Sequence, residues 1–203
     1  MTTLLFTEPV VQSPEPAASP AAEPIVLRIE GLPKGQPRHK PYAMKMGDKW
    51  VGRVHPDPGA GGKIDSWRDS VTLAAQNSPR RPLVPLSGPI RVDLVLLLPR
   101  PKGHYGGGRN AQVLKGSAPA WCTAKPDRDN AEKLILDVLT KLRYWLDDKQ
   151  VCAGEVRKYY ANEYQGQRSG AIVLITPLDE AGGEAFKNAF LQKISDANAV
   201  ESA

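Results

Sequence analysis

The stretch Lys125–Val151, KPDRDNAEKLILDVLTKLRYWLDDKQV, places one pair of aspartates on each side of an apolar repeat. Asp127 and Asp129 are two residues apart, and Asp147 and Asp148 are adjacent. Carboxylates held close together repel one another and raise each other's pKa, so stability alone does not favour this arrangement. The pattern indicates that something positively charged lies among the aspartates.

The residues between the two pairs have the period of an amphipathic helix. Its polar flank carries Asn130, Lys133 and Asp137 at intervals of three and four residues. Leu136 lies outside both flanks, where a second subunit could cover it. We expect a helix of about 14 residues, some 20 Å long, so the next connection must turn back if both pairs share one site. The apolar stripe comprises Ala131, Leu134, Ile135, Val138, Leu139 and Leu142.

The aspartates themselves have two interpretations. Side chains two residues apart in extended backbone point the same way, so Asp127 and Asp129 can face one point. Three or four carboxylates without histidine or cysteine suit a hard cation, which is Mg²⁺, or Mn²⁺ in its place. In the alternative interpretation, Asp129 or Asn130 only caps the helix, and the Asp147-Asp148 pair is a solvated turn.

Lys133 lies one turn into the expected helix and off its apolar stripe. A lysine beside carboxylates and a cation can hold a phosphate oxygen or stabilise the charge that develops on it. It can equally be a surface lysine paired with Asp137 or Asp129, an interaction worth about 0.3–0.5 kcal/mol. Carboxylates, a cation and a lysine together indicate phosphodiester hydrolysis, in which the metal activates a bound water.

Composition narrows the classes of protein that the chain can represent. Its 203 residues suit one domain, and 41% of them are apolar. No apolar run approaches the ~18–20 residues of a membrane span, and the N-terminus lacks the pattern of a signal peptide. Two cysteines, Cys122 and Cys152, are expected to be plain small apolar residues in a cytoplasmic protein. Three histidines at no metal-binding spacing argue against structural zinc.

The net charge of +5 hides a more basic centre. Residues 1–24 and residues 179–203 each carry a net charge of −3, so the part between them carries +11. An excess of this size attracts a polyanion, most often nucleic acid, although a solvated basic surface without a partner is the alternative.

Turn-forming residues and the spacing of apolar residues divide the chain into expected loops, helices and strands. Residues 1–24, rich in proline and alanine, predict a disordered arm. Loops are expected at 31–40, 55–63 and 101–124, and a helix with Trp67 and Val71 on its apolar side should begin at a capping Asp65. We expect strands at Ile25–Glu30, after Pro89 as a central strand, near 154–162 and near 171–176.

These elements predict an α+β domain over residues 25–178, with a small mixed β-sheet and helices packed on one face. The acidic tail, residues 179–203, has a weak helical pattern over residues 184–194.

Lys125–Val151 closely resembles the signature of RusA-type Holliday junction resolvases, the crossover junction endodeoxyribonucleases of bacteria and their phages. That signature is Asp-x-Asp-Asn-x-x-Lys, an aspartate four residues later, and an aromatic-x-Asp-Asp-x-Gln block, all met here without a gap. More loosely, GLPKGQPRHK at residues 31–40 resembles the family's opening loop, and DSWRDSV at residues 65–71 its first helix. The resemblance covers roughly residues 25–178.

The resemblance implies a RusA-like fold in which Asp127, Asp129 and Asp148 bind Mg²⁺ and Lys133 is catalytic. Asp147 is then either a fourth ligand or a residue that orients the ligands. The resemblance also implies a homodimer whose two sites nick symmetric strands of a four-way junction. A dimer would give the apolar parts of the sheet a cover as well.

Basic residues near the aspartates are candidates for DNA contacts, and each is also explained by ordinary surface charge. The 101–124 loop is longer than a minimal family member needs, and basic residues interleaved with aromatics can contact phosphates and stack on unpaired bases. In that loop these residues are Lys102, His104, Tyr105, Arg109, Lys115 and Trp121. The predicted DNA-binding residues are Arg38, His39, Lys40, Lys45, Lys102, Arg109, Lys115, Lys125 and Arg128.

The leading hypothesis is a Mg²⁺-dependent, structure-selective DNA endonuclease that resolves Holliday junctions by paired nicking, in recombination and repair or in phage DNA processing. A flap or fork nuclease is the nearest alternative. A DNA-binding relative that does not cut is less consistent with the presence of all three aspartates and Lys133. A metal-dependent nucleotide phosphohydrolase has no use for a +11 centre, and its binding should depend little on salt.

Overall fold

The computed structural model describes residues 23–36, 40–55 and 62–201. The arm predicted over residues 1–24 therefore lies almost entirely outside the described residues, and so do Arg38 and His39.

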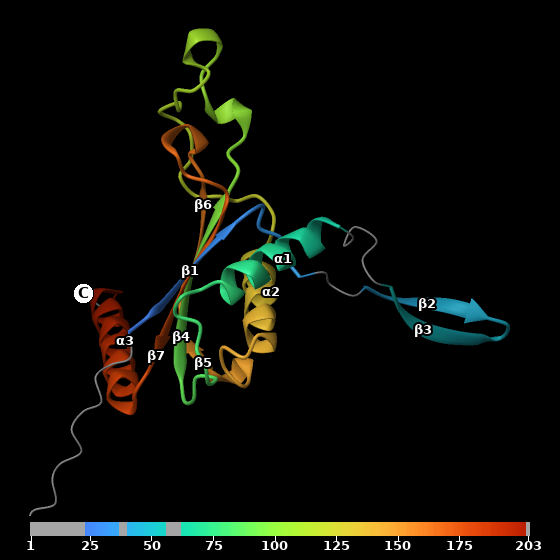
Figure 1. The fold of residues 1–203 in the computed structure, drawn as a ribbon, viewed down its shortest axis with the longest axis vertical. Coiled ribbons are helices and arrows are strands. Elements are labelled where there is room, and N and C mark those ends of the chain that lie inside the picture. The colour runs from blue at the N-terminus through green and yellow to red at the C-terminus, as the bar shows by residue number, and fades with distance from the viewer. Residues whose placement is uncertain (1–22, 37–39, 56–61, 202–203) are drawn as a thin grey trace, which may run out of the picture.

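A five-stranded mixed sheet forms the centre of the molecule (Figure 1). The central strand, β4, pairs antiparallel with β7 on one side and parallel with β5 and β6 on the other, which confirms the predicted central strand. Strand β1 pairs antiparallel with β7 and forms the opposite edge. The strands are β1 (Ile25–Glu30), β4 (Ile90–Leu98), β5 (Val151–Ala153), β6 (Val156–Tyr160) and β7 (Gly170–Pro177).

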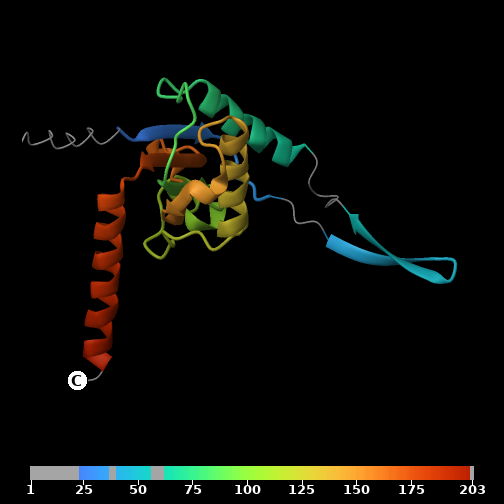
Figure 2. The same ribbon diagram turned by 90° about the horizontal axis from the view of Figure 1, so that it is seen from below.

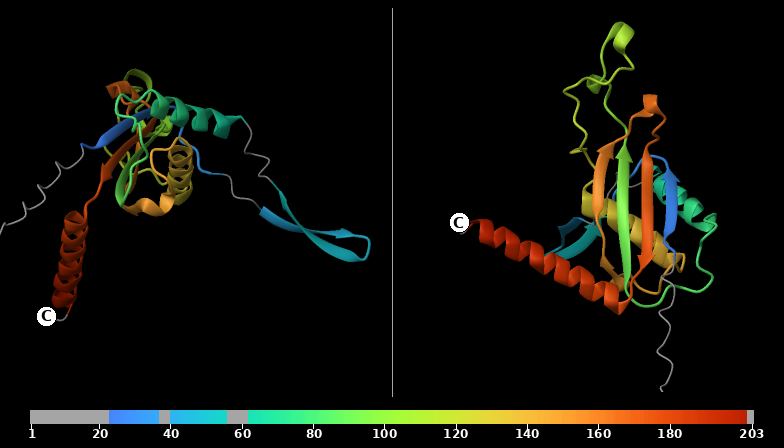
Figure 3. Two further views of the ribbon diagram at one scale, coloured as in Figure 1. Left: turned by 60° about the horizontal axis from the view of Figure 1, so that its bottom comes forward. Right: turned by 90° about the vertical axis from the view of Figure 1, so that its left-hand side faces the viewer.

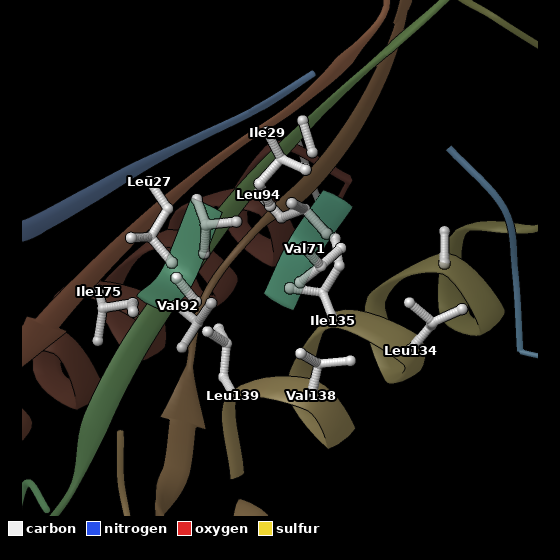
Figure 4. Packing of buried hydrophobic residues seen from close by; sticks show 14 of the residues in the cluster. Leu27, Ile29, Val71, Val92, Leu94, Leu134, Ile135, Val138, Leu139 and Ile175 are labelled. Atoms are coloured by element: carbon white, nitrogen blue, oxygen red, sulfur yellow. The ribbon is translucent and has the colours of Figure 1, made fainter. Parts of the chain in front are cut away.

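Helices α1 (Lys63–Gln76) and α2 (Arg128–Lys141) cover one face of this sheet, as predicted. Strand β4 supplies every second side chain to the core, from Ile90 to Leu98, and these side chains are all buried. Figure 4 shows the apolar side chains of α2 meeting those of β1, β4 and α1. The predicted stripe of α2 is confirmed, because Ala131, Leu134, Ile135, Val138 and Leu139 are buried.

Three expectations about the helices and cysteines are corrected. Helix α1 begins at Lys63 with Gly62 as its N-cap, so Asp65 lies in the first turn and pairs with Arg68 instead of capping. Leu136 is half-buried against the core of its own chain, which covers part of it without a second subunit. Cys152 is exposed, whereas Cys122 is buried as expected.

Among the described residues, no helix covers the opposite face of the sheet (Figure 3). Its apolar side chains on β4 and β7 are half-buried, and a shallow hollow of about 530 Å³ lies on it beside Arg28 and Arg168. Helix α3 (Glu180–Glu201) follows β7 and extends away from the sheet (Figure 2). It is longer than the predicted 184–194 segment. In the described part of the chain, no helix combines the length and apolar character that crossing a bilayer requires.

A two-stranded hairpin, which we call the β-arm (residues 40–55), projects from the body of the molecule (Figures 1 and 2). It pairs β2 (Lys40–Met46) with β3 (Lys49–His55) in antiparallel register. Its described side chains, residues 43–52, are almost all exposed. This hairpin was not predicted from the sequence, because a hairpin that buries neither face lacks the alternation of apolar residues that marks a strand.

The 101–124 loop contains no strand or α-helix, as expected, but two short 3₁₀ helices, η1 (Lys102–His104) and η2 (Gly108–Asn110). It projects beyond one end of the sheet (Figure 1). Its last residues return along β6, since the Cys122 amide donates to the Lys158 carbonyl at 3.1 Å and the Tyr160 amide to Ala120 at 3.2 Å. This return leads the chain to the start of α2.

Candidate functional site

Asp127 is the N-cap residue of α2, with extended backbone, and its carbonyl accepts the Ala131 amide at 3.0 Å. The capping alternative had named Asp129 or Asn130 instead, and is corrected on that point. The Asp127 carboxylate accepts no hydrogen bond from the backbone of the helix it precedes. The Asn130 side-chain amide makes a long 3.5 Å contact with this carboxylate. Capping therefore does not account for this aspartate.

The segment before Asp127 is fastened to the sheet. Lys158 of β6 donates from Nζ to the carbonyls of Ala124 and Pro126, each at 2.6 Å. The Lys125–Pro126 peptide bond is cis. These contacts fix the backbone that leads into the first aspartate pair.

The opening loop, residues 31–36, lies against the first turn of α2. The Gln36 amide donates to the Asn130 carbonyl at 2.9 Å. A side chain at Gly35 would meet Asn130 Cβ at 2.9 Å and Pro126 Cβ at 3.3 Å, so the approach requires glycine. The opening loop, which precedes the β-arm in the chain, thus lies beside the first aspartate pair.

The second pair is positioned by two buried aromatic residues. After α2 the chain reverses at Arg143, which adopts a left-handed φ of 64°, and the Tyr144 amide bonds back to the Leu139 carbonyl at 3.1 Å. The Tyr144 hydroxyl donates to the Ala75 carbonyl of α1 at 2.7 Å. The Trp145 indole donates to Thr140 Oγ1 at 2.7 Å. The turn that follows is therefore anchored to both helices.

Asp147 caps the 3₁₀ helix η3 (Asp148–Gln150). Its carboxylate accepts the Lys149 amide at 3.0 Å, and this hydrogen bond, more than the nearby lysine charge, holds the pKa of Asp147 below its ordinary value. Gln150 Oε1 accepts the amides of Leu146 and Asp147, and Gln150 Nε2 donates to carbonyls just before β4. Asp147 thus stabilises the turn, whereas the Asp148 side chain is exposed to solvent.

The structure brings Asp137, Asp147 and Asp148 to one hollow of about 390 Å³, which Thr140, Lys141 and Leu146 also line. Lys133 is paired with Asp137, Nζ to Oδ1 at 3.3 Å, as one alternative predicted. A mostly exposed pair of this kind contributes little stability, so Lys133 can exchange Asp137 for another anion.

The two aspartate pairs do not meet within one chain. Asp127 stands at the N-terminal end of α2, while Asp148 lies against its C-terminal half, and the helix of 14 residues is about 20 Å long. Over the described ranges, no three His, Cys, Asp or Glu side chains come close enough together to hold a metal ion. The chain reverses after α2, but the reversal does not carry the second pair back to the first.

The predicted DNA-binding residues fall into three places. Lys125 and Arg128 are exposed beside Asp127. Lys45 is exposed on the β-arm, where Lys40 also lies, although its side chain is outside the described part. The remaining residues, Lys102, Arg109 and Lys115, are exposed on the 101–124 loop, away from α2 (Figure 1).

Most aromatic residues of the 101–124 loop are used in packing. Tyr105 is buried against Tyr164, with ring centroids 4.9 Å apart, and the His104 ring contacts another tyrosine edge-on. Trp121 differs, because it stacks on Tyr159 at 4.7 Å yet remains 59% exposed. Trp121 is thus the residue of this loop that could stack on a base.

Sequence reasoning did not single out Lys158. Its position in VRKYY gave a signal, since Val156, two residues earlier on the same side of the strand, is buried in the core. A charged residue in such a position usually has a specific partner.

Comparisons with known proteins identify the family of this chain. The family model described as "Endodeoxyribonuclease RusA" matches residues 20–167. The chain is 34% identical over 114 residues to "Uncharacterized protein YqaN" of Bacillus subtilis (strain 168). This match covers 55% of this chain and 75% of that protein. It is 47% identical over 38 residues to "Crossover junction endodeoxyribonuclease rusA" of Lactococcus phage r1t, covering 19% of this chain and 29% of that protein. The chain belongs to the RusA family of endodeoxyribonucleases.

Proposed function

We propose that this protein is a Mg²⁺-dependent endonuclease that resolves Holliday junctions by nicking two symmetric strands. The observation that carries the proposal is the pair of exposed, oxygen-rich ends of α2, with Asp127 and Asp129 at one end and Asp148 near the other. The name of the Lactococcus phage relative, a crossover junction endodeoxyribonuclease, supports the choice of substrate.

Each residue has a defined part in this proposal. Asp127, Asp129 and Asp148 bind the cation, and Asp147 orients the turn that carries Asp148. Bound Mg²⁺, or Mn²⁺ in its place, would lower the pKa of a water and offset the charge of the phosphate. Lys133, held by Asp137 in the free protein, holds a phosphate oxygen in the complex.

The proposed ligands are of the type that a hard cation binds. Within one chain, however, they lie too far apart to bind one cation together. All of the donors are carboxylates, as Mg²⁺ prefers, yet each end of α2 offers no more than two of the proposed ligands. Two α2 helices related by a two-fold axis and running antiparallel would bring the first pair of one chain to Asp148 of the other. We therefore propose a homodimer with two composite sites.

Exposed apolar residues beside Asp148 support this dimer. Leu83 and Val84 are strongly exposed, and Leu146 is 57% exposed. The segment holding Leu83 and Val84 lies beside the turn after α2, because the Leu86 amide donates to the Tyr144 carbonyl at 2.8 Å. An apolar patch next to half of a charged site is typical of an interface.

The β-arm is proposed to contact the DNA. A two-stranded ribbon has the width of the major groove, and the arm exposes Lys45, Lys49 and Trp50. The arm follows the opening loop, whose Gln36 bonds to the first turn of α2, so an arm bound in a groove would keep the junction tethered to the region of the proposed site. Lys125 and Arg128 would contact the backbone at the cut itself.

The test is incubation of the protein with a synthetic four-way junction, with and without Mg²⁺, beside Asp129→Asn. We expect paired symmetric nicks that need the cation and fall by at least about 100-fold in the variant, with binding retained. Asp69→Asn, an exposed aspartate on α1, is the matched control and should cut normally.

The other outcomes identify the alternatives. Junction binding without cutting in any divalent cation would indicate a non-cleaving relative. Cutting of flaps or forks but not junctions would keep the chemistry and change the substrate. Binding that hardly changes with salt would favour a nucleotide phosphohydrolase. The proposed setting is the cytoplasm, in recombination and repair or in the processing of phage DNA.

A further inference from the structure

Lys158 is a lysine on the core side of the sheet. Its register partner across the parallel β4–β6 pair is Leu96, which is completely buried, and its neighbour on the same side, Val156, is buried too. The Lys158 side chain is half-buried and contacts the segment that leads to α2. It does not point to open solvent, as most strand lysines do.

The ammonium group is bonded to backbone. Nζ donates to the Ala124 and Pro126 carbonyls at 2.6 Å each, which are short distances for charge-assisted hydrogen bonds. These two carbonyls lie on either side of Lys125, and the second belongs to the residue immediately before Asp127. A single side chain thus fixes three consecutive residues at the entry to the first aspartate pair.

The direction of the Asp127 carboxylate depends on this backbone. Asp127 makes no side-chain capping bond that would orient it from the helix. Its carbonyl is fixed by the Ala131 amide, and the chain before Cys122 is fixed by the backbone of β6. Between these two anchors, Lys158 donates two hydrogen bonds of 2.6 Å to residues 124–126, and the Cys122 thiol adds only a long 4.0 Å contact to the Ala124 carbonyl.

We propose that Lys158 is a positioning residue, which holds the 124–127 segment and so sets the direction in which Asp127 presents its carboxylate. The role rests on the proposed function, because Asp127 is one of the proposed cation ligands. Lys158 itself does not contact substrate, since carbonyl groups of its own chain engage its ammonium.

The first test is amide hydrogen exchange of the full chain, without DNA or metal. Lys158→Met removes both bonds and keeps most of the side-chain volume, so the hydrogen-bonded amides that flank the segment, those of Cys122 and Ala131, should exchange about tenfold faster or more, while β7 amides stay unchanged. Lys158→Arg, which can still reach both carbonyls, should restore most of the protection. Lys187→Met, on the exposed face of α3, is the control and should leave the segment unchanged.

The second test separates cutting from binding. In single-turnover cleavage of a four-way junction, Lys158→Met should lower the rate about 10- to 100-fold, the usual effect of losing a residue that orients a ligand. Its Kd for the junction should match that of the native chain, and Lys158→Arg should recover much of the rate. Lys187→Met should cut at the native rate.

The two tests fail in different ways. Unchanged exchange of the Cys122 and Ala131 amides in Lys158→Met would overturn the positioning role, whatever the chain does to DNA. Equal losses of cutting in the methionine and arginine variants, or faster exchange throughout the sheet, would mean a general role in stability and would overturn it as well. A native chain that does not cut junctions would refute the proposed function, but exchange would still decide whether Lys158 holds the segment.

Discussion

Tyr144 joins the turn carrying the second aspartate pair to helix α1. Its ring is buried, its hydroxyl donates to the Ala75 carbonyl, and burial raises the pKa of that hydroxyl above its ordinary value of 10.0. In the unfolded chain the hydroxyl ionises at the ordinary value. As the pH rises past it, the unfolded state loses a proton that the native state retains, so the free energy of unfolding falls.

Tyr144→Phe should therefore cost about 1 kcal/mol at neutral pH, through loss of one hydrogen bond. The difference in stability between the native chain and the variant should shrink from pH ~9 to pH ~11, because only the native chain has this ionisation to suppress. Urea unfolding at a series of pH values measures it. A difference that stays constant across this range would show that the hydroxyl does not titrate as its burial implies.

Single residues also show what sequence could reveal of the site. Asp127, Asp129, Lys133 and Asp148 were identifiable from residue type and spacing, because chemistry of this kind needs carboxylates and a lysine. The hydrogen bonds from Lys158 to Ala124 and Pro126 were not, since they join segments 32 or more residues apart. Only its place on the core side of a strand indicated a specific partner.

The link between β5 and β6 passes very close to the backbone of β4. Gly154 has a φ of 150°, and a side chain there would collide with the Val92 carbonyl oxygen of β4. The link also joins the turn bearing Asp148 to the strand bearing Lys158. Close packing at this glycine thus fixes both halves of the proposed site relative to β4.

Gly154→Ala should therefore lower the free energy of unfolding by about 2–4 kcal/mol, since β5 and β6 must move away from β4. Gly116→Ala is the matched control, because Gly116 has open space around it and an ordinary φ, and it should change stability by no more than about 0.5 kcal/mol. Urea denaturation followed by tryptophan fluorescence gives both values. Equal stabilities for the two variants would contradict the packing described here.

Helices and strands could be predicted from the sequence when one of their faces is buried in the core. Helix α2 and strands β1, β4 and β7 bury side chains at regular intervals, and this periodicity was visible in the chain. Strand β5 has only three residues, too few to show a period. The β-arm pairs through its backbone and buries neither face, so no apolar pattern marks it. The length of α2 was correctly expected, and it separates the two aspartate pairs.

At the scale of the whole molecule, composite sites make a distinctive prediction. Asp129→Asn and Asp148→Asn homodimers should each be inactive. A heterodimer of the two variants contains one damaged site with both substitutions and one intact site with neither. Prepared with different affinity tags, it should nick one strand of a four-way junction and leave the symmetric strand whole.

Sites contained within single chains would give the opposite result. Each chain of the heterodimer would then carry one substitution in its own site, and no strand would be cut. Denaturing gels with each junction strand labelled in turn distinguish the two outcomes, with the native dimer as the control for paired cutting.

The length of α2 also affects the protein concentration at which DNA would be cut. If 14 residues of α2 keep the ligands of one chain apart, a lone chain cannot cut, however tightly it binds DNA. Well below the dissociation constant of the dimer, the amount of active nuclease would rise with the square of the protein concentration. Halving the supply of the protein would cut the activity to about a quarter, so the abundance of the chain would itself act as a threshold for cleavage.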